Sequence, residues 1–253
     1  MRVSLFRRTA VAASAAASLA LLLTACGGEE KKNEDTGKAD AAASASAAAK
    51  PDAKALTAPE LEKLIVAQAD LKGYQVQKAK AADVVNVGDV GADKAACEPL
   101  AEAMSAVSTG TPGASAQRKA VEVKKEGSAS PDDILGALGA PVTSVTLGSY
   151  AGEGAQQAFA SLKTAGTECA HGFTISVSGE KTKVVNVAPE PMTAGDEALG
   201  FTVISQMEGK PFMTTLVVFR KDNNLATFGT MSLTGKVKQL PKAVIDAQAA
   251  KLR

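Results

Sequence analysis

The first 25 residues constrain the rest of this chain most, because they have the pattern of an export signal. Met1 to Arg8 holds three arginines and no acid, and Thr9 to Leu23 is mostly apolar. A basic start, a short apolar stretch and small residues before a cleavage point make up a secretory signal peptide. The apolar stretch is too short to span a hydrocarbon core of about 30 Å. We therefore expect residues 1–25 to be removed and everything after them to lie outside the cytoplasm.

The residue after this segment is a cysteine, and Leu23-Thr24-Ala25-Cys26 resembles a bacterial lipobox. In that family the signal is cut before the cysteine, whose thiol carries a diacylglyceryl group. Two acyl chains hold a protein stably at a membrane, since each buried CH₂ contributes ~0.8 kcal/mol. The resemblance implies lipidation of Cys26, with diacylglycerol and palmitate, at the extracytoplasmic face of the cell membrane. An ordinary secretory signal with a chance cysteine is the alternative, and Arg7-Arg8 leaves both Sec and twin-arginine export open.

Residues 26–55 have the composition of a tether. A run of mixed charge over 29–35 is followed by seven alanines and two serines over 41–49, with no large apolar residue between Gly27 and Ala55. Such a segment cannot bury enough surface to offset its ordering entropy. We expect a disordered tether with an r.m.s. reach of about 30 Å.

Net charge excludes some partners. The full chain carries a formal +1, and loss of Arg2, Arg7 and Arg8 leaves −2. With no basic excess, we expect no nucleic-acid partner and no polybasic contact with the bilayer. Trp is absent, so a rich stacking platform for ring ligands is not expected.

The chain has three cysteines, Cys26, Cys97 and Cys169. If Cys26 is acylated, an even pair remains in an oxidising compartment. We expect a Cys97–Cys169 disulfide, which should stabilise the fold by roughly 4 kcal/mol on the chain-entropy model. Two separate buried thiols are the alternative.

Periodicity divides the remaining chain into helices and strands. Thr57 and Glu60 form a capping box that starts the first helix, and Gly73 ends it. Apolar residues at helical spacing predict further helices over 93–107, 132–138, 154–165 and 240–252. Alternating patterns predict strands over 74–77, 118–125, 142–150, 173–178, 183–188, 199–207, 212–220 and 225–233.

This order favours one α+β domain over residues 56–253. The economical architecture is an antiparallel sheet of about five to six strands with helices packed on one face. Two long irregular segments, 108–117 and 189–197, are candidate ligand loops. A groove between sheet and helices, lined by phenylalanines, is a second candidate, although the same rings could be plain core: Phe159, Phe173, Phe201 and Phe212.

The only histidine, His171, follows Cys169 by two residues. This spacing is compatible with a metal half-site, a nucleophile–base pair or a pH sensor. A disulfide at Cys169 would consume the thiolate, which favours a surface histidine beside a structural bridge.

Other chemical motifs are weak. Gly152-Glu153-Gly154 lacks the third glycine of a nucleotide loop, so it more plausibly starts a helix. The acids Asp132-Asp133, Glu190 and Asp196-Glu197 could serve glycoside hydrolysis as pairs, yet loop acids are usually solvated caps. We therefore assign no catalytic, cofactor-binding or metal site, expect no cofactor and expect no enzymatic activity.

Element order and cysteine placement suggest a family. The segment from Val145 to Tyr150, the helix with Phe159 and Leu162, Cys169, the strand meander and the closing helix resemble PknH-like extracellular sensor domains of actinobacteria. The likeness covers roughly Leu56 to Leu252. It implies an α+β domain with a cleft that senses extracytoplasmic ligands. Members commonly carry two disulfides, whereas this domain can form one.

The function expected from the sequence is a lipid-anchored, non-enzymatic binding or sensor module at the cell envelope. Its partners would be the membrane, through the anchor, and an envelope ligand or protein. A lipid or glycolipid carrier with an apolar cavity is the alternative, and an envelope hydrolase is a third possibility.

Overall fold

The computed structural model describes residues 53–123, 139–232, 234, 237 and 239–253. The predicted signal peptide over 1–25, nearly all of the predicted tether and the predicted helix over 132–138 lie outside these ranges.

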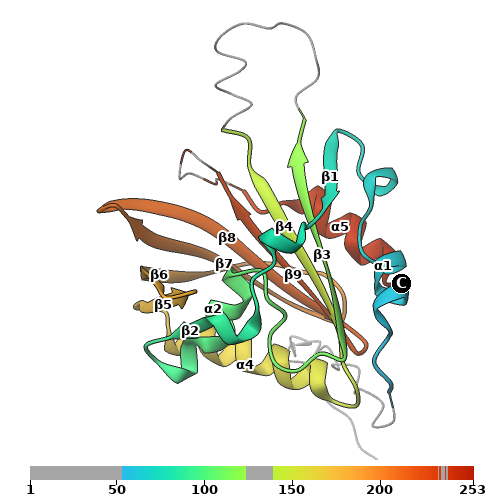
Figure 1. The fold of residues 1–253 in the computed structure, drawn as a ribbon, viewed down its shortest axis with the longest axis horizontal. Coiled ribbons are helices and arrows are strands. Elements are labelled where there is room, and N and C mark those ends of the chain that lie inside the picture. Colours follow the sequence, from blue (N-terminus) through green and yellow to red (C-terminus); the bar gives the residue numbers. More distant parts are fainter. Residues whose placement is uncertain (1–52, 124–138, 233, 235–236, 238) are drawn as a thin grey trace, which may run out of the picture. The chain divides into compact units, whose positions relative to one another are not determined.

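A nine-stranded antiparallel sheet forms the framework of the described chain (Figure 1). Its strand order is β1-β3-β4-β9-β8-β7-β6-β5-β2, so the last five long strands form a continuous meander. The strands are β1 (Tyr74–Lys78), β2 (Val90–Ala92), β3 (Ala114–Glu122), β4 (Val142–Ser149), β5 (Phe173–Val177), β6 (Glu180–Glu190), β7 (Glu197–Met207), β8 (Lys210–Lys221) and β9 (Asn224–Met231).

The expected count of five to six strands was therefore wrong. Strand β2 has only three residues and no alternating pattern of its own, and it forms by pairing with β5. Strand β3 starts at Ala114, so four of the ten residues of the predicted loop over 108–117 are strand paired with β4. Whether such short or polar segments form strands depends on the strands beside which they lie, since strand preference depends strongly on context.

Within the described residues, four α-helices pack on this sheet: α1 (Ala58–Leu64), α2 (Glu98–Met104), α4 (Gly154–Glu168) and α5 (Lys242–Lys251). Helix α1 begins as predicted, because the Thr57 backbone N–H donates to Glu60 Oε2 at 2.7 Å. It ends earlier than predicted, since Ile65 has extended backbone angles. Helix α2 is also shorter than predicted, because Ala95–Cys97 form a 3₁₀ turn before it.

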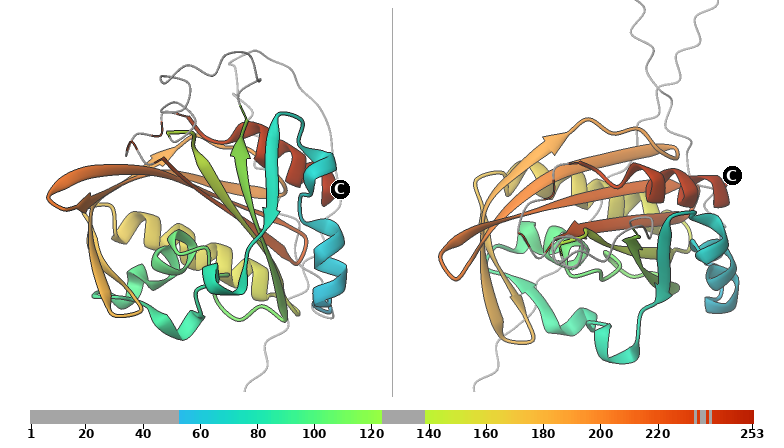
Figure 2. Two further views of the ribbon diagram at one scale, coloured as in Figure 1. Left: turned by 45° about the horizontal axis from the view of Figure 1, so that its top comes forward. Right: turned by 90° about the horizontal axis from the view of Figure 1, so that it is seen from above.

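The helices cover both faces of the sheet, which corrects the expectation of one covered face (Figure 2). Alternate residues of β8 explain this: Leu216 and Val218 belong to the core under α2 and α4. Val217 and Phe219 belong to a second core, which includes Ile65 and Ile245 beside α1 and α5. A strand that is apolar on both sides needs cover on both sides.

The sheet curves around α2 and α4, so the β5–β6 hairpin lies beside α2 and β2 (Figure 2). Helix α4 approaches the sheet closely at Gly166. A Cβ built at Gly166 would lie 2.6 Å from two ring atoms of Phe201. Only a residue without a side chain permits this distance.

Gln248 joins the two helices on the other face. Its side chain is fully buried, accepts the Val66 N–H at 2.9 Å and donates to the Leu64 carbonyl at 2.9 Å. The amide therefore satisfies backbone groups at the end of α1, where no intrahelical partner is available.

Candidate functional site

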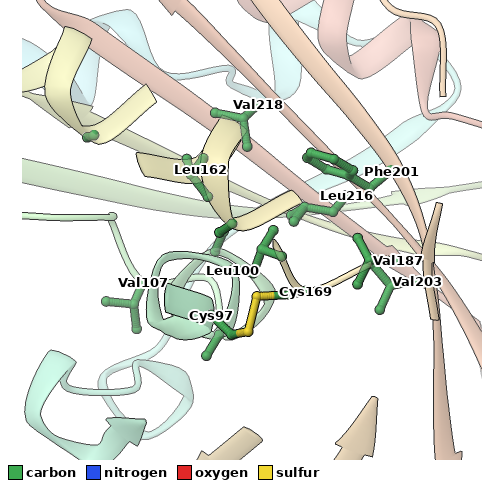
Figure 3. Close-up of a cluster of buried hydrophobic side chains, with 14 of the residues drawn as sticks. Cys97, Leu100, Val107, Leu162, Cys169, Val187, Phe201, Val203, Leu216 and Val218 are labelled. Atoms are coloured by element: carbon green, nitrogen blue, oxygen red, sulfur yellow. A yellow bond between two sulfur atoms is a disulfide. The ribbon is translucent and has the colours of Figure 1, made fainter. Parts of the chain in front are cut away.

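A disulfide links Cys97, just before α2, to Cys169, just after α4, with 5.8 Å between the Cα atoms. Both cysteines are fully buried, and Figure 3 shows the bridge among the side chains of the α2/α4 core, including Leu100 and Leu216. The bridge fixes α2 against α4 at one end of the space between helices and sheet.

A pocket of about 260 Å³ lies at the other end of α2, against the concave face of the sheet. The end of α2 contributes Met104 and Ser105, and Val85 comes from the loop before β2. Strands β5 to β9 provide the remaining walls: Ile175, Val177, Thr182, Ser205, Met207, Phe212, Thr214, Thr215, Leu216, Gly229, Thr230 and Met231.

The lining of this pocket is apolar or hydroxylated, and none of the described residues that form it carries a charge. Three methionines border it, and two of them, Met207 and Met231, are about half exposed. Large exposed apolar side chains that gather at one hollow are unusual on a soluble surface and mark binding sites.

Gly229 lies within β9, which runs between β4 and β8 in the middle of the sheet. A Cβ at this position would meet no atom within 4 Å. A glycine inside a strand lowers stability and often marks a place where a ligand approaches the backbone. The packing of the fold does not require a glycine here. A glycine at the floor of a pocket, however, leaves space for a bound molecule.

Ser205 supplies a polar point on the same face. It is opposite Phe212 in the β7–β8 register, is 5% exposed, and its hydroxyl makes no hydrogen bond within the described residues. Thr182 and Thr214 add two hydroxyls with no partner in the same ranges. These groups are available to a bound molecule.

The predicted phenylalanine groove is partly filled. Phe159, Phe173 and Phe201 are each only 4% exposed and belong to the α2/α4 core. Only Phe212 lines the pocket. The sequence located the general region but missed the residues that shape it, and the glycine inside a strand pattern was the available signal.

His171 is exposed and borders a separate polar hollow with Asp93, Lys94 and Lys183. Lys94 Nζ donates to the Gly172 carbonyl at 2.7 Å, and Asp93 Oδ1 accepts the Thr174 N–H. Cys169 is oxidised, so neither a Cys–His catalytic pair nor a thiolate metal ligand is present there. Over the ranges that the structure covers, no three His, Cys, Asp or Glu side chains are grouped to hold a metal ion.

The predicted acidic pairs have structural partners. Glu190 Oε1 accepts the Thr202 hydroxyl at 2.7 Å. Asp196 and Glu197 both contact Arg220, at 3.2 Å and 2.6 Å. Asp132-Asp133 lies outside the described residues.

Arg220 has a structural role that no pattern in the sequence indicated. It is fully buried at the end of β8, and its Nη1 also donates to the Asp222 carbonyl at 2.8 Å. Burial alone would raise the pKa of Asp196, but hydrogen bonds from Lys221 and from the Asp222 N–H, with the nearby cationic charges, hold it below the ordinary value. This cluster fastens the β8–β9 hairpin to the start of β7.

Comparisons with known proteins give the fold limited context. No family model and no curated protein matches the chain. The extracellular domain of PknH from Mycobacterium tuberculosis is similar at a TM-score of 0.45 and 9% identity, over 79% of this chain and 97% of that one. An uncharacterised protein of Mycobacterium smegmatis, the Rv0999 ortholog, is similar at 0.32 and 13%, over 80% and 96%. These values are too low to transfer a site or a function.

No helix in the described ranges is long and apolar enough to cross a membrane.

Proposed function

We propose that this chain is a lipid-anchored extracytoplasmic module that binds an apolar ligand in the pocket between α2 and strands β5 to β9. The observation that carries the proposal is the open space above Gly229, in the middle of a central strand. The strand has no side chain at this position, and the lining residues around it are apolar or hydroxylated, without a charge among the described ones.

The proposed compartment rests on two independent features. The export segment ends in Leu23-Thr24-Ala25-Cys26, which supports a lipid anchor at the extracytoplasmic face of the cell membrane. The buried Cys97–Cys169 disulfide supports an oxidising compartment.

The proposal assigns binding rather than catalysis. The pocket is lined by thioethers, aliphatic groups, one ring and hydroxyls, with no imidazole, carboxylate or amine. Acid–base chemistry needs a titratable group within hydrogen-bond reach of the reacting atom. A sensor role follows if an envelope protein recognises the occupied form.

A carrier of large glycolipids is the second candidate, and the pocket size argues against it. Ligand pockets for drug-sized molecules typically measure about 300–1,000 Å³. The pocket here, about 260 Å³, lies just below that range. It suits a small ligand better than a lipid with several chains.

The test is native mass spectrometry of the chain carrying Cys26→Ser, purified without detergent. We expect an adduct that Gly229→Leu removes, because leucine would fill the pocket. Gly91→Leu is the matched control, since Gly91 lies in strand β2, has equal space around its Cβ and does not line the pocket. An adduct that survives Gly229→Leu would contradict the site. Separately, the acyl mass on the peptide that begins at Cys26 tests the anchor.

A further inference from the structure

The lining of the pocket narrows the class of ligand. Resting on the proposed function, we infer that the pocket takes a neutral molecule with a single aliphatic chain and a small oxygen-bearing head group. Charge, shape and the placement of hydroxyls each support this class.

Charge is the first argument. Among the described residues, none that borders the pocket is ionisable, and Leu216 and Ser205 within it are almost completely buried. An ionised head group moved into such a site would lose its hydration without gaining an opposite charge, which costs far more than burial of a neutral group. The site therefore selects against carboxylates, phosphates and amines.

Shape is the second argument. Met104, Met207 and Met231 approach the pocket from α2, β7 and β9. Methionine side chains are unbranched and adaptable, so they pack well along a flexible chain. Phe212 is the only ring in the lining, which leaves an aromatic ligand without a pair of rings to stack between. The volume of about 260 Å³ favours one chain over two.

The hydroxyls are the third argument. The Thr215 hydroxyl lines the pocket, is buried and has no hydrogen-bond partner in the described ranges, and Ser205, which is 5% exposed, adds a second hydroxyl without a partner there. A buried hydroxyl left without a partner is costly, so a ligand oxygen that accepts a hydrogen bond from it would be favoured. Thr182 and Thr214 stand nearby on β6 and β8 and offer further hydrogen bonds to a hydroxyl or ester.

A fluorescence titration tests this class, because the chain contains no Trp. Phe212→Trp, in the chain with Cys26→Ser, would place a single indole in the pocket wall. The probes are glycerol monolaurate, laurate and dilauroyl phosphatidylcholine, each below its micelle concentration. The first two share one chain and differ in head-group charge, and the third adds a second chain together with a zwitterionic phosphocholine head group.

We expect saturable binding of glycerol monolaurate, and binding of laurate weaker by about tenfold or more, since an unpaired charge costs at least ~1.4 kcal/mol. Ser205→Ala should weaken monolaurate binding by roughly 3- to 10-fold. Gly229→Leu should abolish it and Gly91→Leu should leave it unchanged. Calorimetry with Phe212 intact should give the same order of affinities.

The outcomes separate the two proposals. The inferred ligand class would be overturned if laurate or the two-chain lipid bound as tightly as monolaurate. If Gly229→Leu still removed that binding, the pocket would remain the binding site. If no probe binds and native mass spectrometry finds no adduct, the proposed function itself fails. Circular dichroism and thermal unfolding of each variant exclude misfolding as the cause.

Discussion

Arg220 Nε donates to Glu197 Oε1 at 2.6 Å although no part of the Arg220 side chain reaches solvent. The same guanidinium contacts Asp196, which is itself only 10% exposed. A buried arginine must be paired and hydrogen-bonded, since an isolated buried charge is prohibitively unfavourable. The acids at this corner of the sheet, which the sequence offered as a candidate hydrolytic pair, therefore hold the β8–β9 hairpin in place.

Replacing Arg220 tests this role. We expect Arg220→Met to lower the free energy of unfolding by about 3 kcal/mol, the low end of the range for a broken buried pair, because Glu197 keeps partial solvent access. Urea unfolding gives the value. Lys119→Met, at the exposed ion pair with Asp83, is the control and should change stability by roughly 0–1 kcal/mol. Equal small losses in both variants would show that the buried cluster is not structural.

Gly166→Ala should destabilise the protein, contrary to the usual effect in a helix. Alanine in place of a helical glycine normally stabilises by about 1 kcal/mol. At Gly166 the new Cβ would lie 2.6 Å from the buried Phe201 ring, and overpacking typically costs about 1–3 kcal/mol.

The control is the same change combined with Phe201→Leu, which removes the ring atoms. A double-mutant cycle should show strong coupling, with Gly166→Ala becoming neutral or stabilising beside leucine. A stabilising effect of Gly166→Ala in the native background would refute the close helix–sheet contact.

Glu102 should make stability fall as pH rises. Partial burial of its carboxyl raises its pKa, and the Glu98 charge adds to this, although the Gly110 N–H bond opposes it. The folded state therefore binds its proton more tightly than the unfolded state, so this contribution to stability is complete below 4.5 and is lost as pH rises through the folded pKa.

We expect Glu102→Gln to be more stable than the native chain at neutral pH, by less than about 1 kcal/mol because the group is half solvated, with the difference vanishing in acid. Urea unfolding over a pH series measures it. Glu60 provides a control of opposite sign. The Thr57 backbone bond lowers its pKa, so Glu60→Gln should lose stability at neutral pH and match the native chain in acid.

Removing the disulfide should affect both stability and binding. The bridge spans 72 residues, and loss of a native disulfide typically costs about 2–5 kcal/mol, so Cys97→Ala with Cys169→Ala should lower the melting temperature clearly. Because the bridge fixes α2, which carries Met104 to the pocket, monolaurate binding should weaken as well. Reductant should lower the melting temperature of the native chain and leave the double variant unchanged. A reductant effect on both would indicate a cause other than this bridge.

The sequence by itself determined the elements whose signals are local. The capping box at Thr57 and Glu60 starts α1 where predicted. The alternating residues of β5 to β9 identify the meander, because side chains on a strand point to opposite faces with a period of two. The count of cysteines, with Cys26 set aside for the lipid anchor, identified the two residues that form the bridge. Each of these inferences needs only neighbours along the chain or a simple count.

Tertiary structure decided how these elements are layered. Runs such as Leu216 to Phe219 show that a strand is apolar on both sides, but not which helix covers which side. Likewise, nothing local distinguishes Arg220 from the exposed basic residues around it, and the strand position of Gly229 hints at a special role without showing that a pocket lies above it. Burial and empty space are set by segments distant in the sequence. The sequence therefore specified most strands and the disulfide, while the pocket arises only when α2 and five strands come together.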